Sequence, residues 1–102
     1  MPRKKAKVFK FTNTKGVHYE AIFRKPDSRA YDDADGICYD PDDPQPKIYI
    51  KPGMSPQREL NTCVHELAHA FFWNRPEYQI ARFASTVSRF LYAQGWRKEK
   101  KD

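Results

Sequence analysis

The sequence lacks the features of a membrane protein and of a disulfide-stabilised protein. No apolar run approaches the roughly 20 residues that a helix needs to cross a bilayer, and no apolar signal core follows the basic start. Only two residues are cysteines, Cys38 and Cys63, too few for the disulfide framework of a small secreted domain. We therefore expect an intracellular, cytoplasmic protein with two reduced thiols; a Cys38–Cys63 bridge is the alternative.

Acidic residues are scarce at the two ends of the chain, where the excess positive charge lies. The formal net charge is +6 over 102 residues, but residues 1–10 hold five basic residues and no acid, and residues 97–102 hold four basic and two acidic ones. A basic lead (1–10), one domain (11–96) and a charged tail (97–102) are expected. The tails could contact nucleic acid weakly and without sequence preference, although solubility is the commoner explanation.

One short pattern, H-E-x-x-H at residues 65–69, indicates a specific chemistry. On a helix, His65 and His69 lie one turn apart on the same face, so both imidazoles can bind one zinc ion. Glu66 is displaced by about 100° around the axis, where it can act as the general base toward a water on the metal. The alternative is two surface histidines on an ordinary amphipathic helix.

Two helices are predicted around this pattern. Ser55 suits an N-cap and Pro56 the first helical position, and Asn74 to Pro76 would end the first helix. A second helix is expected over residues 76–94, with Gly95 as its stop. Apolar residues recur at helical spacing in both helices and predict their packing faces: Leu60, Val64, Leu67 and Phe71 in the first, and Ile80, Phe83, Ala84, Val87, Phe90 and Leu91 in the second.

Strand-forming residues precede the helices, in segments 8–12, 17–23, 36–39 and 47–51. Together they predict an α+β fold in which a small antiparallel or mixed sheet of three to four strands packs on two core helices. The segment with Ile48, Tyr49 and Ile50 directly precedes the motif helix, so it could be an edge strand that binds an extended peptide substrate. An ordinary strand within the sheet is an equally good interpretation.

A catalytic zinc ion takes three protein ligands, and we look for the third by elimination. No histidine follows His69, and the acids beyond the motif are Glu77, Glu99 and Asp102. The last two lie in the charged tail, whereas Glu77 opens the second helix across a short connection, where it can reach the histidines. Glu77 is therefore the expected ligand, although an acid in a first helical turn also complements the helix dipole.

A polar side chain that stabilises the developing oxyanion would complete the site. We nominate Tyr78, which follows Glu77, Tyr49 in the strand before the motif helix, and His18 in an earlier strand. His18 is also a conceivable third ligand, but an exposed strand residue is its commoner role.

His65-Glu66-Leu67-Ala68-His69, with Glu77 opening the next helix, resembles a gluzincin metallopeptidase of minimal size. Over residues 31–96, the order of strands, Gly-x-Cys loop, motif helix and a helix ending in Gly95-Trp96 is similar to small phage-type metallopeptidases, and in outline to the ImmA/IrrE and SprT-like groups. The resemblance implies a zinc ion (Zn²⁺) bound by His65, His69 and Glu77, with Glu66 as catalytic base. The chain has Glu77-Tyr78-Gln79-Ile80-Ala81 where the ImmA/IrrE group usually has Glu-x-x-Ala-Asn, and no second lobe is recognisable, so a shallow site is expected.

These observations favour hydrolysis of peptide bonds in a peptide or protein substrate. Two alternatives stay open. One is a catalytically weak or inactive fold of the same kind that binds a protein partner. The other is a SprT-like protease associated with nucleic acid through the basic tails.

Overall fold

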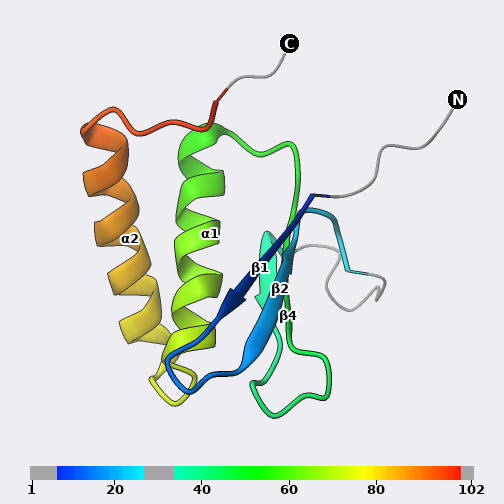
Figure 1. The fold of residues 1–102 in the computed structure, drawn as a ribbon. Coiled ribbons are helices and arrows are strands. Elements are labelled where there is room, and N and C mark those ends of the chain that lie inside the picture. Colours follow the sequence, from blue (N-terminus) through cyan, green and yellow to red (C-terminus); the bar gives the residue numbers. More distant parts are fainter. Residues whose placement is uncertain (1–6, 27–33, 100–102) are drawn as a thin grey trace, which may run out of the picture.

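The computed structural model describes residues 7–26 and 34–99, and within them it contains a four-stranded mixed sheet and two helices (Figure 1). This confirms the predicted α+β class. The elements follow one another as β1 (Val8–Thr12), β2 (His18–Ile22), β3 (Gly36–Cys38), β4 (Lys47–Ile50), α1 (Pro56–Phe71) and α2 (Glu77–Ala93). Residues 1–6 of the predicted lead, 27–33 before β3 and 100–102 of the predicted tail lie outside the described residues.

The strands have the spatial order β1-β2-β4-β3. β1 and β2 form an antiparallel hairpin, β2 and β4 are parallel, and β3 and β4 are antiparallel. β4 is therefore an interior strand, and the prediction that Ile48, Tyr49 and Ile50 form an edge for a peptide is wrong. All three side chains are at most 4% exposed, because an interior strand that is covered on both faces carries consecutive buried residues.

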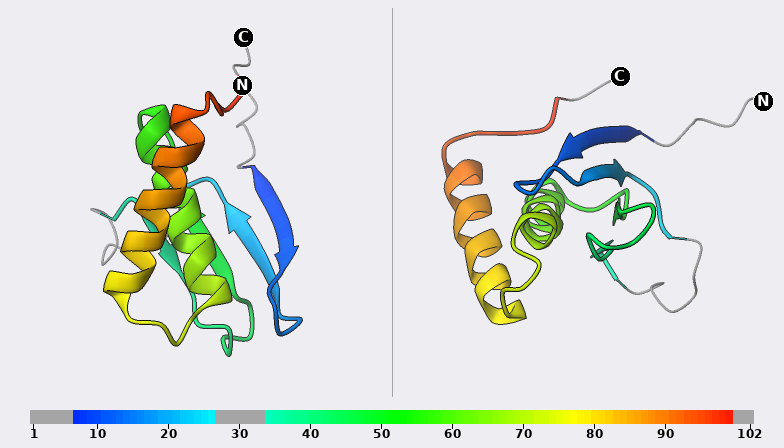
Figure 2. Two further views of the ribbon diagram at one scale, coloured as in Figure 1. Left: turned by 90° about the vertical axis from the view of Figure 1, so that its left-hand side faces the viewer. Right: turned by 60° about the horizontal axis from the view of Figure 1, so that its bottom comes forward.

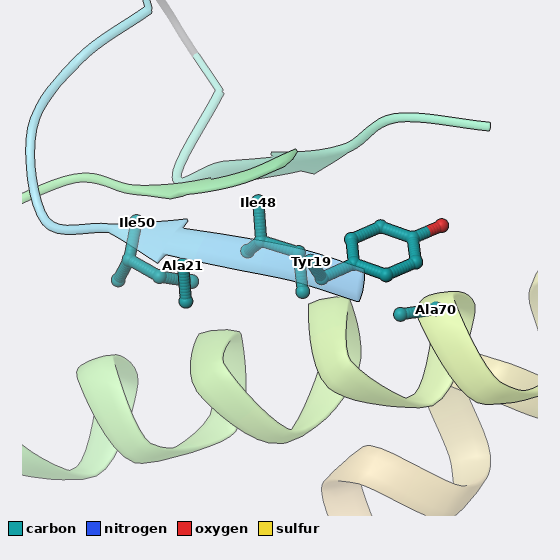
Figure 3. Close-up of a cluster of buried hydrophobic side chains, with 5 residues drawn as sticks. All are labelled: Tyr19, Ala21, Ile48, Ile50 and Ala70. Carbon is teal, nitrogen blue, oxygen red and sulfur yellow. The ribbon is translucent and has the colours of Figure 1, made fainter. Parts of the chain in front are cut away.

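The main core lies between the sheet and α1. Tyr19, Ala21, Ile48 and Ile50 from β2 and β4 lie on the side of the sheet that faces α1, and Ala70 of α1 completes the cluster next to Tyr19 (Figure 3). Facing them, α1 buries residues four apart, namely Thr62, Glu66 and Ala70. The predicted apolar stripe is thus not the most buried face of α1. Leu67 and Phe71 of this stripe stay 37% and 38% exposed, although the ring of Phe71 stacks on Phe11 of β1.

α2 packs on α1 and not on the sheet (Figure 2). It buries one narrow face, formed by Ile80, Ala84 and Ser88. Phe83 and Phe90 were predicted to be core residues, and this is wrong, since they are 47% and 61% exposed. A helix with a single neighbour buries a narrower stripe than its apolar pattern suggests. Neither of the described helices combines the length and the apolar character needed to cross a membrane.

The helix ends follow local sequence signals to different degrees. α2 ends in a Schellman motif, in which Gly95 has φ +92° and the amides of Gly95 and Trp96 donate to the carbonyls of Tyr92 and Leu91, each at 3.0 Å. Gly95 thus terminates the helix as predicted. Ser55 occupies the N-cap position of α1, but its side chain makes no capping hydrogen bond.

Asn13 fixes the β1–β2 turn to the C-terminal end of α1. Its side-chain Oδ1 accepts hydrogen bonds from the amides of Lys15 and Val17 at 3.0 and 2.9 Å, and its Nδ2 donates to the carbonyl of Ala70 at 3.1 Å. Because Asn13 is only 7% exposed, water cannot readily replace these bonds.

Replacing Asn13 by Ala should lower the free energy of unfolding by about 1–3 kcal/mol, since it removes three hydrogen bonds at a buried position. Urea denaturation followed by circular dichroism measures this change. Asn74→Ala is the matched control, because Asn74 is exposed between the helices and should cost less than about 0.5 kcal/mol. Equal losses in the two variants would contradict the role given to Asn13.

Candidate metal centre

The helical repeat of α1 brings the two motif histidines together. Their Nε2 atoms are 3.2 Å apart, and their ring centroids are separated by 4.9 Å. Both side chains are half-buried at the border between the face of α1 that meets the sheet and the solvent. The arrangement leaves two ring nitrogens directed at one point in space.

Glu77 reaches this point from the first residue of α2. Its Oε1 lies 2.8 Å from Nε2 of His65, and its Oε2 lies 2.8 Å from Nε2 of His69. The connection between the helices makes this possible because it turns immediately: the amide of Phe72 donates to Ala68 and the amide of Arg75 donates to Phe72. The chain thus reverses direction within five residues and returns a carboxylate to the histidine face.

Among the described residues, His65, His69 and Glu77 form a group that could hold a metal ion, with ligand atoms all within 4.8 Å of one another. In a tetrahedral zinc site with Zn–N bonds of about 2.0–2.1 Å, two nitrogens are about 3.3 Å apart, close to the 3.2 Å between these Nε2 atoms. Burial lowers the pKa of His69, which favours the neutral imidazole that a metal requires. The three side chains therefore fit a divalent ion in geometry and in chemistry.

Glu66 lies beside this group and is buried. Only 7% of the residue is exposed, and burial, followed by the negative charge of Glu77, raises the pKa of its carboxyl group to about 7. A carboxyl group with such a pKa can both accept and release a proton near neutral pH. Its carboxylate is not among the converging ligand atoms, so it stays available for proton transfer.

The three motif side chains and Glu77 line a cleft of about 790 Å³ between α1 and β3. β3 is an edge strand of the sheet, and its three residues, Gly36 to Cys38, line one wall. A second hollow of about 400 Å³, lined by Arg58 and Asn61, continues along α1 past Glu66. β3, and not β4, is therefore the strand that a bound peptide could meet.

None of the three nominated oxyanion groups lines this cleft. His18 lies on the hairpin, where its Nδ1 is 3.1 Å from the hydroxyl of Thr12. Tyr49 is buried in the sheet at 4% exposure, and Tyr78 is 65% exposed and accepts a hydrogen bond from Gln79. The structure thus brings together His65, Glu66, His69 and Glu77, and leaves these three side chains elsewhere.

Four polar residues of the cleft were missed by the sequence analysis, namely Tyr39, Asp40, Asp43 and Arg75. Tyr39 directly follows β3, and Arg75 lies in the connection between the helices. Within the described part of the chain, the guanidinium of Arg75 has neither an ion pair nor a hydrogen bond. The sequence offered one signal for Arg75, its position in the short Asn-Arg-Pro connection next to Glu77. This position indicates that Arg75 lies near the site, but it does not indicate what the side chain does there.

Gly36 allows β3 to approach α1 beside Glu66. A Cβ atom at this position would lie 2.8 Å from Cγ2 of Thr62, 2.9 Å from the carbonyl oxygen of Tyr49 and 3.0 Å from Cγ of Glu66. Arg58 of α1 holds the same region through two hydrogen bonds of 2.7 Å to the carboxylate of Asp35. The cleft wall and the buried carboxyl group are therefore packed directly against each other.

Comparison with protein-family models gives a match to Peptidase M78, described as the IrrE N-terminal-like domain, over residues 20–87. The match covers about two thirds of the chain and includes His65, Glu66, His69 and Glu77. No curated protein and no solved structure matches the chain.

Gly36→Ala should lower the free energy of unfolding by about 1–3 kcal/mol, because the added methyl group overpacks the contact between β3 and α1. It should also weaken metal binding about 10–100-fold, because the added methyl group would displace α1, the helix that carries His65 and His69. Denaturation and zinc titration measure the two effects.

Gly53→Ala is the matched control for this prediction. Gly53 has φ +82° but no atom within 4 Å of an added Cβ, so the substitution strains the backbone without touching the site. It should cost stability and leave zinc affinity unchanged. A Gly36→Ala protein with unaltered zinc affinity would contradict the link between this contact and the metal centre.

Proposed function

The chain belongs to the family of IrrE N-terminal-like domains, a metallopeptidase-like family, and from this premise we propose that it is a zinc-dependent peptidase. The observation that carries the proposal is the convergence of His65, His69 and Glu77 beside the buried carboxyl group of Glu66. In the proposal the first three residues hold the zinc ion, and Glu66 is the general base.

A bound zinc ion supplies Lewis acidity, which polarises a carbonyl group and lowers the pKa of water. Glu66 would take the proton from the attacking water and later transfer it to the leaving amine. Its raised pKa, about 7, suits both transfers at neutral pH. The substrate would lie along β3 in the cleft as an extended peptide.

The group that stabilises the oxyanion is best sought within the cleft. Arg75 is the stronger candidate, since it lines the cleft and carries a permanent positive charge that can bind an oxyanion. Tyr39 is the second, through its hydroxyl group. Both replace the earlier nominations of His18, Tyr49 and Tyr78, which lie outside the cleft.

The two cysteines and the charged tails bear on the location of the protein and on further partners. Cys38 and Cys63 are free thiols, as is usual in reducing compartments, and we propose that the protein works in the cytoplasm. Contact with nucleic acid through the tails stays a prediction. Of their described cations, Lys98 pairs with Glu59 at 2.8 Å, and Arg97 binds the carbonyls of Tyr92 and Trp96.

Glu66→Gln should retain about one zinc ion per chain and reduce peptide hydrolysis about 10²–10⁴-fold, because glutamine cannot accept the proton. Metal analysis, together with cleavage of a quenched fluorescent peptide library, measures both properties. Glu59→Gln is the control, since Glu59 lies on the same helix but pairs with Lys98 away from the cleft. Hydrolysis by Glu66→Gln at the normal rate would refute the proposed mechanism.

Glu77→Ala should weaken zinc binding by about two orders of magnitude or more, since it removes one of three protein ligands. Equilibrium dialysis against a zinc buffer gives the affinity. Glu99→Ala is the control, because Glu99 is another acid that follows the motif but is exposed in the tail. If the two variants bind zinc equally well, the third ligand is not Glu77.

A further inference from the structure

An apolar groove runs along the side of α1 that faces away from the metal centre. It consists of two hollows of about 470 and 370 Å³, which share Phe23, Cys63 and Lys98 as lining residues and therefore adjoin each other. The first lies between α1 and the end of α2, and the second lies between α1 and the β1–β2 hairpin. We call the two hollows together the α1 groove. It shares no lining residue with the cleft at the metal centre.

The α1 groove reaches the core of the protein. Ala21, Ile48 and Ile50, which are 7%, 1% and 2% exposed, form part of its lining. This depth follows from the packing of α2, which covers α1 and not the sheet (Figure 2). The sheet beside α1 therefore has no second helix over it among the described residues. A side chain that entered the groove would pack directly against the core.

Large apolar side chains stay exposed around the groove. Phe9 and Trp96 are 62% and 66% exposed, and Val8 and Leu67 are 49% and 37% exposed. Exposed apolar surface of this kind in a small domain marks an interaction site. A small molecule inside the hollows would leave the outer faces of these rings in water, whereas the apolar face of a helix would cover them.

The charges around the groove are predominantly positive. Lys7, Arg97 and Lys98 line it, and its single carboxylate, Glu59, is paired with Lys98. A second copy of the chain would present the same cations to this surface. An acidic partner, in contrast, would complement it.

We propose that the α1 groove binds an amphipathic helix of a partner protein, with an apolar stripe that enters the groove and acidic residues on its flanks. The stripe would follow the i, i+3, i+4, i+7 spacing of helices that bind in grooves. The bound helix would lie beside α1 over β1 and β2, where it would cover the exposed side chains of Phe9 and Leu67. This docking site is independent of the peptidase function, because the groove and the metal centre lie on different sides of α1.

The test uses two synthetic helical peptides of about 18 residues, or five turns. Both carry leucine at the groove-facing positions; one has glutamate at the flanking positions, and the other has lysine at the same positions. Fluorescence anisotropy of the labelled peptides with the full chain measures affinity. We expect the glutamate peptide to bind at least about tenfold more tightly than the lysine peptide, and its affinity to fall as salt is raised.

Variants of the chain locate the binding site. Leu67→Glu and Trp96→Ser should each weaken binding of the glutamate peptide, whereas Tyr78→Ser should not. Tyr78 is the matched control, because it is as exposed as Trp96, at 65% against 66%, but lies outside the groove. Lys98→Glu should weaken the glutamate peptide and strengthen the lysine peptide. Circular dichroism verifies that each variant is folded.

Three outcomes would overturn the proposal. They are absence of binding, equal binding of the two peptides, and binding that survives both Leu67→Glu and Trp96→Ser in folded protein. If the peptides do not bind, two further measurements identify another occupant of the groove. It is a second copy of the chain if light scattering finds a dimer that Leu67→Glu dissociates, or a membrane if phosphatidylglycerol vesicles bind the chain and Leu67→Glu abolishes the binding.

Discussion

The tight contact between α1 and the sheet governs the geometry of the candidate site. Thr62, Glu66 and Ala70 face the strands, and Gly36 leaves no room for a methyl group between β3 and the helix. Because the helix lies so close, Glu66 is enclosed, and enclosure raises its pKa toward neutrality. The same orientation turns His65 and His69 to the rim of the cleft. A carboxyl group suited to proton transfer and a pair of imidazoles that could bind a metal ion thus result from one packing constraint.

The short-range features of the protein could be predicted from the sequence. Helical periodicity, Pro56 and Gly95 predicted both helices to within a residue or two, and strand-forming residues predicted the strands. The placement of Glu77 next to the histidines was also accessible, because few acids follow the motif and the connection before it is short. Each of these inferences depends on residues that are close together in the chain, where spacing and local conformation determine the outcome.

The long-range features could not be predicted in the same way. Strand order decides which strand is an edge, and the sequence contains no signal that β4 would lie between β2 and β3. The apolar residues of α2 did not reveal that it would contact α1 alone, so Phe83 and Phe90 were assigned to a core that does not reach them. Tyr39 and Arg75 enter the cleft through tertiary folding, and no pattern marks such residues in a single sequence.

The division of the converging side chains between two helices has a thermodynamic consequence. α2 is held to the rest of the protein through α1, so its detachment disrupts one interface and leaves the sheet and α1 in contact. Glu77 belongs to α2, whereas the histidines belong to α1. A metal ion bound by all three side chains would link α2 to α1, so it would stabilise the attached state of α2 over the detached state. By mass action, each tenfold rise in the free metal concentration above the dissociation constant of the metal would make detachment of α2 less favourable by about 1.4 kcal/mol. The fraction of molecules in which α2 is attached would then depend on the free metal concentration of the surrounding solution.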